Sequence, residues 1–405
     1  MTTHSIHWNR RRFLQASGAS LSGILLTQHA PNWPISTANP NAKIRLAVAG
    51  GGFGAAHHWH EHPQCQITAV TDLVEERRQA LINNYKCQDV FPSLEDMLEK
   101  AADQFDAVAV FTDAPSHVKH AIMCFEKGKH VVSACPVGLT IEELKKLLAV
   151  KKRTGLVYMM HESSYYRQPC IAAREAYQNG EFGKLCFTEV EYYHPGIGAR
   201  HNSLSRWQGV DSWRFGFPPM LYPTHSLGFL VGVSSERITK VSCIGQRVGD
   251  DFPAAADNHY RNPFNNEFAL GITNLGNSCR FAVCWQIAAD GERAQWLGEN
   301  LSLWMDGSAG QPQAKRKIDG AWERWDVPNY WSTDRLPEPM RHDSGHGGSS
   351  AFLCAEFVNA LLEQREPAID IYESIAMTAP GIVAHQSALA GGTQLDVPQF
   401  DDKNG

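Results

Sequence analysis

The residues best placed for chemistry in this sequence form a glycine-rich loop and an acidic residue downstream of it. Residues 50–55 read GGGFGA, directly after a short apolar run, and Asp72 ends the next apolar run. In the pattern G-x-G-x-x-G/A the first glycine makes a tight turn, the second lets the backbone approach a pyrophosphate, and the small third residue lets a helix pack on a strand. The sequence therefore predicts a dinucleotide site at Gly50, Gly52, Phe53, Gly54, Ala55 and Asp72.

The acidic residue also bears on which dinucleotide is bound. A carboxylate at this position binds the ribose hydroxyls of NAD and repels the 2′-phosphate of NADP. We therefore expect NAD rather than NADP, although Arg77 and Arg78 nearby weaken that preference. We also expect the helix after the loop to point its N-terminus at the phosphates.

Phenols and an imidazole farther along the chain could move protons. His225 lies in a polar turn of sequence YPTH that begins at Tyr222, and Tyr192 lies on an expected strand. Imidazole and phenol groups act as general acids and bases when they reach a substrate. We predict that His225 and these tyrosines do so, with Tyr192 or His225 as the base.

Cysteine and histidine offer two further chemistries that the sequence disfavours. Cys135 has no basic partner visible in sequence, so a buried thiol beside the cofactor is expected rather than a nucleophile. His57, His58, His60 and His62 cluster as metal ligands do, but at most two of them could share a face of the helix expected after the glycine loop. With no carboxylate or cysteine to complete the set, we expect no metal site.

The elements around the glycine loop alternate as strand and helix. Such alternation predicts an α/β Rossmann domain, with a doubly wound parallel sheet, over residues 42–155. Longer alternating runs follow, which predict an α+β domain with an open, mostly antiparallel sheet over residues 156–400. The expected strands of the first sheet are 44–49, 67–71, 107–111 and 130–133, and the expected helices are 75–83, 94–100, 117–127 and 141–152.

The N-terminus is typical of an export signal. Arg10 and Arg11 precede a weakly apolar stretch and then a polar segment with small residues, as in a twin-arginine signal peptide. We expect residues 1–38 to be this signal and its linker, with periplasmic location; a disordered basic tail is the alternative. The apolar run is too short for a membrane anchor. The ten scattered cysteines form no CxxC pair, which favours reduced thiols.

Charge and size limit the partners. A net charge of -6 without a basic stripe offers nothing to a phosphate backbone, so nucleic acid is not an expected partner. With 405 residues the chain is long enough for two domains, each with its own core. A small sugar-like substrate and a homo-oligomer formed through the C-terminal sheet are the partners we expect, besides the export machinery.

A family resemblance begins at residues 112–117, which read TDAPSH, and continues at 128–131, which read GKHV. These segments resemble the third nucleotide-contacting loop of the Gfo/Idh/MocA oxidoreductases. The resemblance implies cofactor contacts at Thr112, His117 and Cys135. The chain departs from that family twice: residues 134–136 read ACP where the family has E-K-P, and Leu221 stands four residues before His225 where the family has Asp.

Other segments resemble the NAD-dependent α-N-acetylgalactosaminidase-type glycosidases of the same superfamily. These segments are the YPTH turn, residues 159–165 (MMHESSY), 189–194 (EVEYYH) and 345–348 (GHGG). The resemblance implies catalytic or substrate roles in one pocket for several side chains, and the aromatic face of Trp213 suits a sugar. The catalytic candidates are His225, Tyr192, Tyr222 and Tyr165, and the substrate-binding candidates are His194, His346 and Trp213.

Three functions are compatible with these residues. The first is an NAD-dependent oxidoreductase that acts on a sugar with tightly held cofactor, because an exported enzyme finds little free NAD. The second is a glycoside hydrolase or lyase in which the sugar is oxidised transiently and reduced again. The third is a sugar- or NAD-binding protein without activity, which the missing Lys and Asp would explain.

Overall fold

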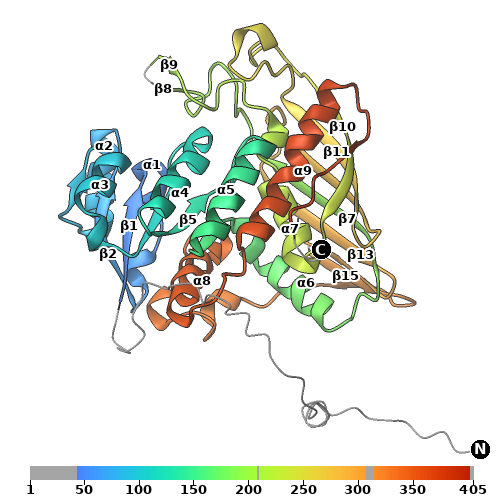
Figure 1. Cartoon of the computed structure of the whole chain (residues 1–405). Coiled ribbons are helices and arrows are strands. Elements are labelled where there is room, and N and C mark those ends of the chain that lie inside the picture. The colour runs from blue at the N-terminus through green and yellow to red at the C-terminus, as the bar shows by residue number, and fades with distance from the viewer. Residues whose placement is uncertain (1–42, 208, 307–312, 402–405) are drawn as a thin grey trace, which may run out of the picture. The chain divides into compact units, whose positions relative to one another are not determined.

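The computed structural model describes residues 43–207, 209–306 and 313–401, and all of them lie in one compact unit (Figure 1). The predicted export signal, with Arg10 and Arg11, lies outside the described residues. The predicted division into residues 42–155 and 156–400 stays a prediction. No helix among the described residues is long and apolar enough to cross a bilayer.

The first sheet is parallel throughout, with the strand order β3-β2-β1-β4-β5-β6. Strand β1 lies between β2 and β4, so the chain changes direction across the sheet at β1, and ligands of such sheets bind at the carboxyl ends of the strands beside this point. The predicted α/β Rossmann fold is confirmed. The strands are β1 Ile44–Ala49, β2 Cys65–Thr71, β3 Val90–Phe91, β4 Ala107–Val110, β5 His130–Ala134 and β6 Tyr158–His161.

The helices between these strands follow the sequence closely. Helix α5 (Ile141–Thr154) begins with a capping box, in which the Thr140 hydroxyl accepts the Glu143 N–H and the Glu143 carboxylate accepts the Thr140 N–H. It ends at Gly155, whose φ of 67° is left-handed. The other helices of this part are α2 Glu75–Tyr85, α3 Leu94–Lys100 and α4 His117–Glu126.

The long helix expected after the glycine loop is absent, and that prediction is wrong. Helix α1 covers only Gly51–Gly54, and a 3₁₀ turn follows at Trp59–Glu61. Residues 57 and 58, between α1 and this turn, have no helical structure, and His57 and Trp59 are both buried. Helix α8 (Ser349–Glu363), from the far end of the chain, packs against β1 and this turn.

The second sheet is open and mixed, and runs β16-β15-β14-β13-β7-β12-β11-β10-β17. Only β7 and β12 pair in parallel; the other pairs are antiparallel, so the prediction of a mostly antiparallel sheet is confirmed. The strands are β7 Leu185–Tyr193, β10 Ile238–Gln246, β11 Asn266–Thr273, β12 Ser278–Cys284, β13 Gly291–Gly298, β14 Leu301–Trp304, β15 Ala314–Lys317, β16 Trp322–Arg324 and β17 Leu395–Asp396. A separate hairpin joins β8 (Arg206–Trp207) to β9 (Val210–Asp211).

Three helices accompany this sheet. Helix α7 (Thr224–Ser234) packs on β7, β12 and β13 and is apolar on nearly all sides, as a helix inside a core must be. Helix α9 (Ile371–Leu389) lies along β10 and also contacts α5 and β6, so it joins the two sheets (Figure 1). Helix α6 (Gln168–Gln178) packs against α7.

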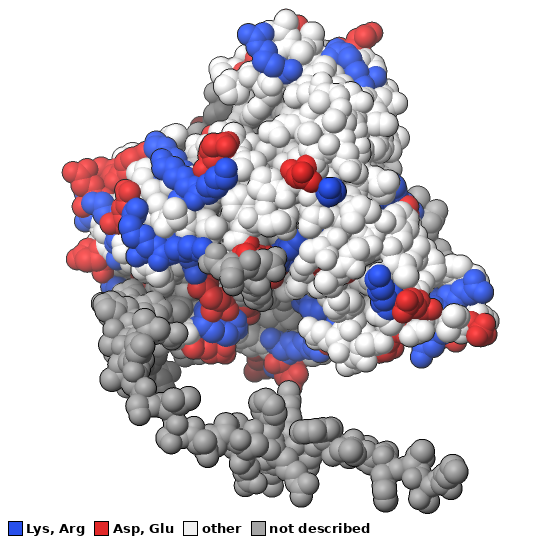
Figure 2. Space-filling model, turned by 45° about the vertical axis from the view of Figure 1, so that its right-hand side comes forward, with Lys and Arg blue, Asp and Glu red and all other residues white. Residues whose placement is uncertain are grey.

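One face of the second sheet is left with exposed apolar side chains. On β11 the residues Phe268, Leu270 and Ile272 alternate with buried ones and are 40%, 53% and 39% exposed. Ile244 on β10, which pairs with Phe268, is 69% exposed. On the face of the molecule shown in Figure 2, acidic and basic side chains are interspersed, with wide uncharged areas between them.

Candidate active site

A single large cavity of about 1210 Å³ runs from the glycine loop to the turn that precedes α7. It is larger than a small sugar alone needs, and is sufficient for a dinucleotide and a sugar together. Most of the predicted site residues lie on its wall: Gly50, Gly52, Phe53, Asp72, Thr112, Cys135, Tyr192, His194, Trp213, Tyr222, His225 and His346.

The glycine loop has the close packing that a dinucleotide loop requires. Gly50 has a φ of 105°, and a Cβ there would lie 2.2 Å from the carbonyl oxygen of Phe111. A Cβ at Gly52 would meet only the side chain of Arg77, at 3.3 Å. Because these positions are glycines, the backbone of the loop is open to the cavity, and a pyrophosphate can approach it closely. Because α1 is a single turn, the backbone N–H groups rather than a helix dipole offer this binding.

Asp72 holds the loop and also faces the cavity. One carboxylate oxygen accepts the Gly51 N–H at 2.7 Å and the other accepts the Val74 N–H at 2.8 Å. A carboxylate can accept further hydrogen bonds, so it is still able to bind ribose hydroxyls. Arg78 turns away to the Asp72 carbonyl oxygen, at 2.6 Å, and to Glu75, whereas Arg77 lines the cavity.

Three predicted cofactor residues do not line the cavity and are corrected. Gly54 is buried, and a Cβ there would touch Val48 and Phe111, so Gly54 rather than Ala55 is the small residue that lets the loop pack on the sheet. The His117 ring lies 2.7 Å from the Pro136 carbonyl oxygen and 3.1 Å from that of Thr112. His117 therefore holds two cavity loops together from behind.

The acid/base residues converge at the other end of the cavity. His225, in the first turn of α7, lies with Nδ1 2.6 Å from a carboxylate oxygen of Glu162 and Nε2 4.0 Å from the Cys135 sulfur. The Cys135 thiol donates to the Tyr222 hydroxyl at 3.5 Å. The Tyr192 ring meets the His225 ring edge-on, with centroids 4.6 Å apart. Cys135, which replaces the family lysine, thus has a histidine beside it that the sequence did not reveal.

Glu162 is the functional residue that the sequence analysis missed. It follows β6, is fully buried, and also accepts the Ser164 N–H at 3.0 Å. The family pattern pairs a histidine with a carboxylate four residues earlier, where this chain has Leu221; Glu162 supplies that carboxylate from another element. The signal was present, because Glu162 lies in the segment 159–165 that resembles the glycosidases.

The charges of this pair follow from its burial. Desolvation alone would lower the pKa of His225, but the adjacent Glu162 carboxylate raises that pKa well above its usual value. Desolvation likewise opposes ionisation of Glu162, yet the neighbouring His225 lowers its pKa to about 2. Burial raises the pKa of Tyr192 and of Tyr222, which keeps both phenols protonated. His225 is therefore an unusually basic imidazole flanked by two neutral hydrogen-bond donors.

The structure does not bring Tyr165, a predicted catalytic residue, to the wall of this cavity. Its ring lies under the guanidinium of Arg174, with 3.9 Å between the guanidinium carbon and the ring centroid, and does not reach the cavity. The 3₁₀ turn Ser163–Tyr166 rotates the chain by about 120° per residue, so Ser163 faces the cavity and the tyrosine does not.

The cavity wall also contains two histidines that were not among the predicted site residues. His57 and His161 are buried and line the cavity, and their ring centroids lie 4.3 Å apart. Desolvation lowers the pKa of each, that of His161 to about 3, so both rings are neutral. His161 and Glu162 are neighbours in the chain yet face opposite sides, as successive residues of a strand do.

The fold and the loop define a nucleotide-binding protein of the Rossmann class, and comparison with known families makes this specific. Residues 44–162 match the family described as oxidoreductase family, NAD-binding Rossmann fold, of the Gfo/Idh/MocA type. Residues 281–404 match the C-terminal domain of glycosyl hydrolase 109. These two matches confirm the resemblance seen in the sequence, and NAD is the cofactor that the first of them implies.

Similar proteins share nearly the full length. A glycosyl hydrolase family 109 protein of Shewanella amazonensis is 26% identical and covers 97% of this chain and 96% of its own. An alpha-N-acetylgalactosaminidase of Shewanella oneidensis is 22% identical over 98% of this chain and 96% of its own.

Solved structures show the same fold at low identity. The WlbA dehydrogenase of Bordetella pertussis, in complex with NADH and UDP-GlcNAcA, superposes with a TM-score of 0.69 at 19% identity, covering 89% of this chain and 99% of its own. A levoglucosan dehydrogenase, in complex with NADH and levoglucosan, gives a TM-score of 0.72 at 15% identity, covering 88% and 100%.

Proposed function

We propose that this protein is an NAD-dependent glycosidase that oxidises a ring carbon of its sugar substrate transiently and reduces it again. The observation that supports this most is the buried His225–Glu162 pair, which lies with two protonated tyrosines in the same cavity as the dinucleotide loop. The glycosyl hydrolase 109 domain and the full-length relatives favour this function over the simple oxidoreductase expected first from the sequence.

NAD, when bound, accepts a hydride from a ring carbon and returns it at the end of the cycle. As the hydride leaves, the hydroxyl on that carbon would lose its proton to solvent and become a carbonyl. The carbonyl would acidify the C–H of the neighbouring carbon, which adjoins the carbon that bears the glycosidic oxygen. Neutral His225 accepts the C–H proton and then donates it to the departing glycosidic oxygen as that C–O bond breaks. Water would then add at the carbon that lost the glycosidic oxygen, by the reverse proton transfers. Return of the hydride to the carbonyl carbon and of a proton from solvent to its oxygen would restore the hydroxyl. The sum is glycoside plus water giving sugar plus alcohol, with no net oxidation.

The other side chains support this single proton carrier. Glu162 makes His225 a stronger base, which a weakly acidic C–H requires, and stabilises the imidazolium that forms. The Tyr192 and Tyr222 phenols stay protonated and can donate hydrogen bonds to the carbonyl oxygen as negative charge develops on it. Cys135 lies where the related oxidoreductases have a lysine, and its thiol donates a hydrogen bond to the Tyr222 hydroxyl.

The deciding experiment measures turnover without added cofactor. The protein is assayed with a panel of aryl glycosides in D₂O, following phenol release and deuterium at each ring carbon of the product. Phenol release with deuterium at one ring carbon is expected, together with stoichiometric NAD in the supernatant of the heat-denatured protein. Hydride exchange with free sugars but no phenol release would instead support a sugar oxidoreductase, and neither reaction would leave a binding protein.

A further inference from the structure

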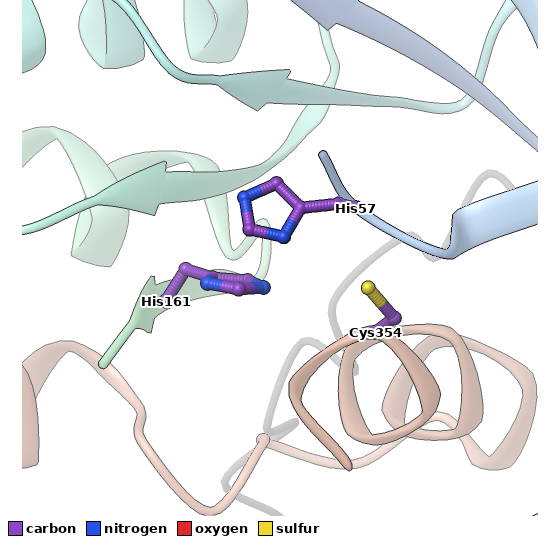
Figure 3. A group of neighbouring side chains, drawn as sticks. All are labelled: His57, His161 and Cys354. Atoms are coloured by element: carbon purple, nitrogen blue, oxygen red, sulfur yellow. The ribbon is translucent and has the colours of Figure 1, made fainter. Parts of the chain in front are cut away.

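Side chains from three distant parts of the chain meet at one part of the cavity, where two histidines line the wall and a cysteine lies outside the lining. His57 follows α1, His161 ends β6 and Cys354 lies on α8, and all three point toward a common space (Figure 3). Their ligand-type atoms lie within 4.8 Å of one another, and all three side chains are buried, at 2%, 4% and 0% exposure. The sequence predicts no metal site because no carboxylate or cysteine near the histidines completes the set; the fold brings Cys354 to two histidines.

The two histidines are short of hydrogen-bond partners. Within the described part of the chain, neither ring nitrogen of His57 has a partner, nor has Nε2 of His161. Buried polar atoms are nearly always satisfied, so unpaired imidazole nitrogens aimed at a shared space indicate a missing ligand. Phe111 stacks on the His57 ring, with centroids 4.5 Å apart, and fixes its plane without satisfying its nitrogens.

We propose that His57, His161 and Cys354 bind a zinc ion. Two imidazole nitrogens and one thiolate form the donor set that borderline-soft divalent ions prefer, whereas Mg²⁺ and Ca²⁺ require oxygen ligands. Tetrahedral zinc places such ligand atoms about 3.4 to 3.6 Å apart. Side-chain rotations that move these atoms by about an ångström would bring them to that spacing. His57 and His161 line the cavity and Cys354 lies behind them, so the fourth position of the ion faces the cavity, where water or a substrate oxygen binds.

Two other groups of potential ligands are less suited to a metal. In the group of His58, Glu61 and His342, the Glu61 carboxylate already pairs with both histidines, at 3.0 and 2.6 Å. In the group of Cys135, Glu162 and His225, the Glu162 carboxylate is likewise already paired with the histidine, at 2.6 Å. Only the His57 group combines burial with unpaired nitrogens among the described residues.

Cobalt substitution tests this site directly, without measuring activity. The full-length protein is dialysed against a chelator and titrated with Co²⁺, whose bond to a thiolate gives a near-ultraviolet charge-transfer band. We expect the band to saturate at one ion per chain, and equimolar Zn²⁺ to abolish it. In C354S the band is lost, and in H161Q the affinity for Co²⁺ falls by more than the roughly tenfold to hundredfold that an outer partner costs.

Two cysteine variants serve as matched controls. C124S removes another fully buried thiol, on α4, and should keep the band at full intensity; C135S should keep it as well, since that thiol belongs to the other group. Far-ultraviolet circular dichroism verifies that each variant is folded. A band that survives in C354S and disappears in C135S would overturn the proposal, as would a folded wild-type protein that binds no cobalt.

Discussion

The basicity of His225 is the property on which the proposed chemistry depends most. His225 lies in the first turn of a helix buried on nearly all sides, so its position is fixed by packing, and its second ring nitrogen faces the cavity. Glu162 is buried completely and has His225 as its charge partner. One carboxylate therefore controls both the orientation and the pKa of the imidazole.

Substitutions of His225 and of Cys135 show which of the two side chains carries the chemistry. In H225A we expect activity to fall by about a hundredfold or more, the usual scale for a positioned acid/base group, with NAD still bound. C135S should keep its NAD and lose less than about tenfold, because a hydroxyl can replace the thiol as a donor to Tyr222. Steady-state rates and released NAD measure both. An inactive C135S beside an active H225A would contradict this assignment.

Replacing Glu162 changes the pH dependence of the reaction. Neutral His225 starts the proposed cycle, so activity rises with pH through its pKa, which Glu162 raises. In E162Q that pKa falls, so the ascending limb of the pH–rate profile moves to lower pH, and the maximal rate falls because the base is weaker. E175Q, which alters a carboxylate paired with Arg335 outside the cavity, is the control. An unmoved limb in E162Q would remove His225 from the rate-determining proton transfer.

Residue types were more predictable from the sequence than their partners. The YPTH turn identified Tyr222 and His225, and the structure places both on the cavity wall. The segment 159–165 pointed to Glu162 as a residue near the site, but no local pattern says which distant residue a histidine will meet, so neither Glu162 nor Cys354 could be paired with its histidine from the sequence. Tyr165 was misassigned because a family motif gives spacing but not the direction of a side chain within a 3₁₀ turn.

At the scale of elements, two glycines of the glycine loop have different surroundings, so we expect different effects when each is replaced by alanine. G50A should lower the melting temperature strongly, because its Cβ would lie 2.2 Å from a backbone oxygen at a φ of 105°. G52A should fold normally, since its Cβ meets only the movable Arg77 side chain, but should lose NAD because the methyl stands where the pyrophosphate approaches.

The control for these variants is G128A. Gly128 has a left-handed φ of 72° with nothing near its Cβ position, so the substitution costs about 1 kcal/mol and leaves NAD bound. Differential scanning calorimetry and NAD content measure all three variants. Normal NAD retention in G52A would show that the pyrophosphate does not approach this glycine.

The elements themselves were largely predictable where they repeat a local rule. The expected strand 44–49 and helix 94–100 agree with β1 and α3 at both ends, because apolar runs and caps are local signals. The helix expected after residue 54 failed because its place is taken by α8, nearly 300 residues later in the chain. The packing of α8 against β1 depends on contacts between residues far apart in the chain, and a short window of sequence does not contain this information.

At the scale of the whole molecule, the predicted export signal and the proposed chemistry suit each other. Twin-arginine transport moves folded proteins, and a cycle without net oxidation needs no free NAD, so we propose that the enzyme leaves the cytoplasm with its cofactor bound. In the variant with Arg10 and Arg11 both replaced by Lys, the precursor should stay in the cytoplasm, as cell fractionation and immunoblotting would show. A variant that still reaches the periplasm would contradict the predicted signal.

The exposed apolar row on the second sheet supports the expected homo-oligomer. Ile244, Phe268, Leu270 and Ile272 lie on neighbouring strands on one face of the sheet, and contiguous apolar surface of this kind marks an interface. The same row on a second copy of the chain could cover it. A contact between two identical patches is symmetric, as in most homodimers. We propose that a second copy of this chain is the partner.

A charge in that row should therefore separate the subunits. In L270E, light scattering after gel filtration should give the mass of one chain where the wild type gives at least two, because a buried unpaired carboxylate opposes association. I318E is the control: Ile318 is 66% exposed but follows β15, which lies near the other edge of the sheet from β10. None of the four residues of the row lines the cavity, so the L270E monomer should also keep its NAD. A wild-type monomer, or an L270E protein with the wild-type mass, would show that this face is not the interface.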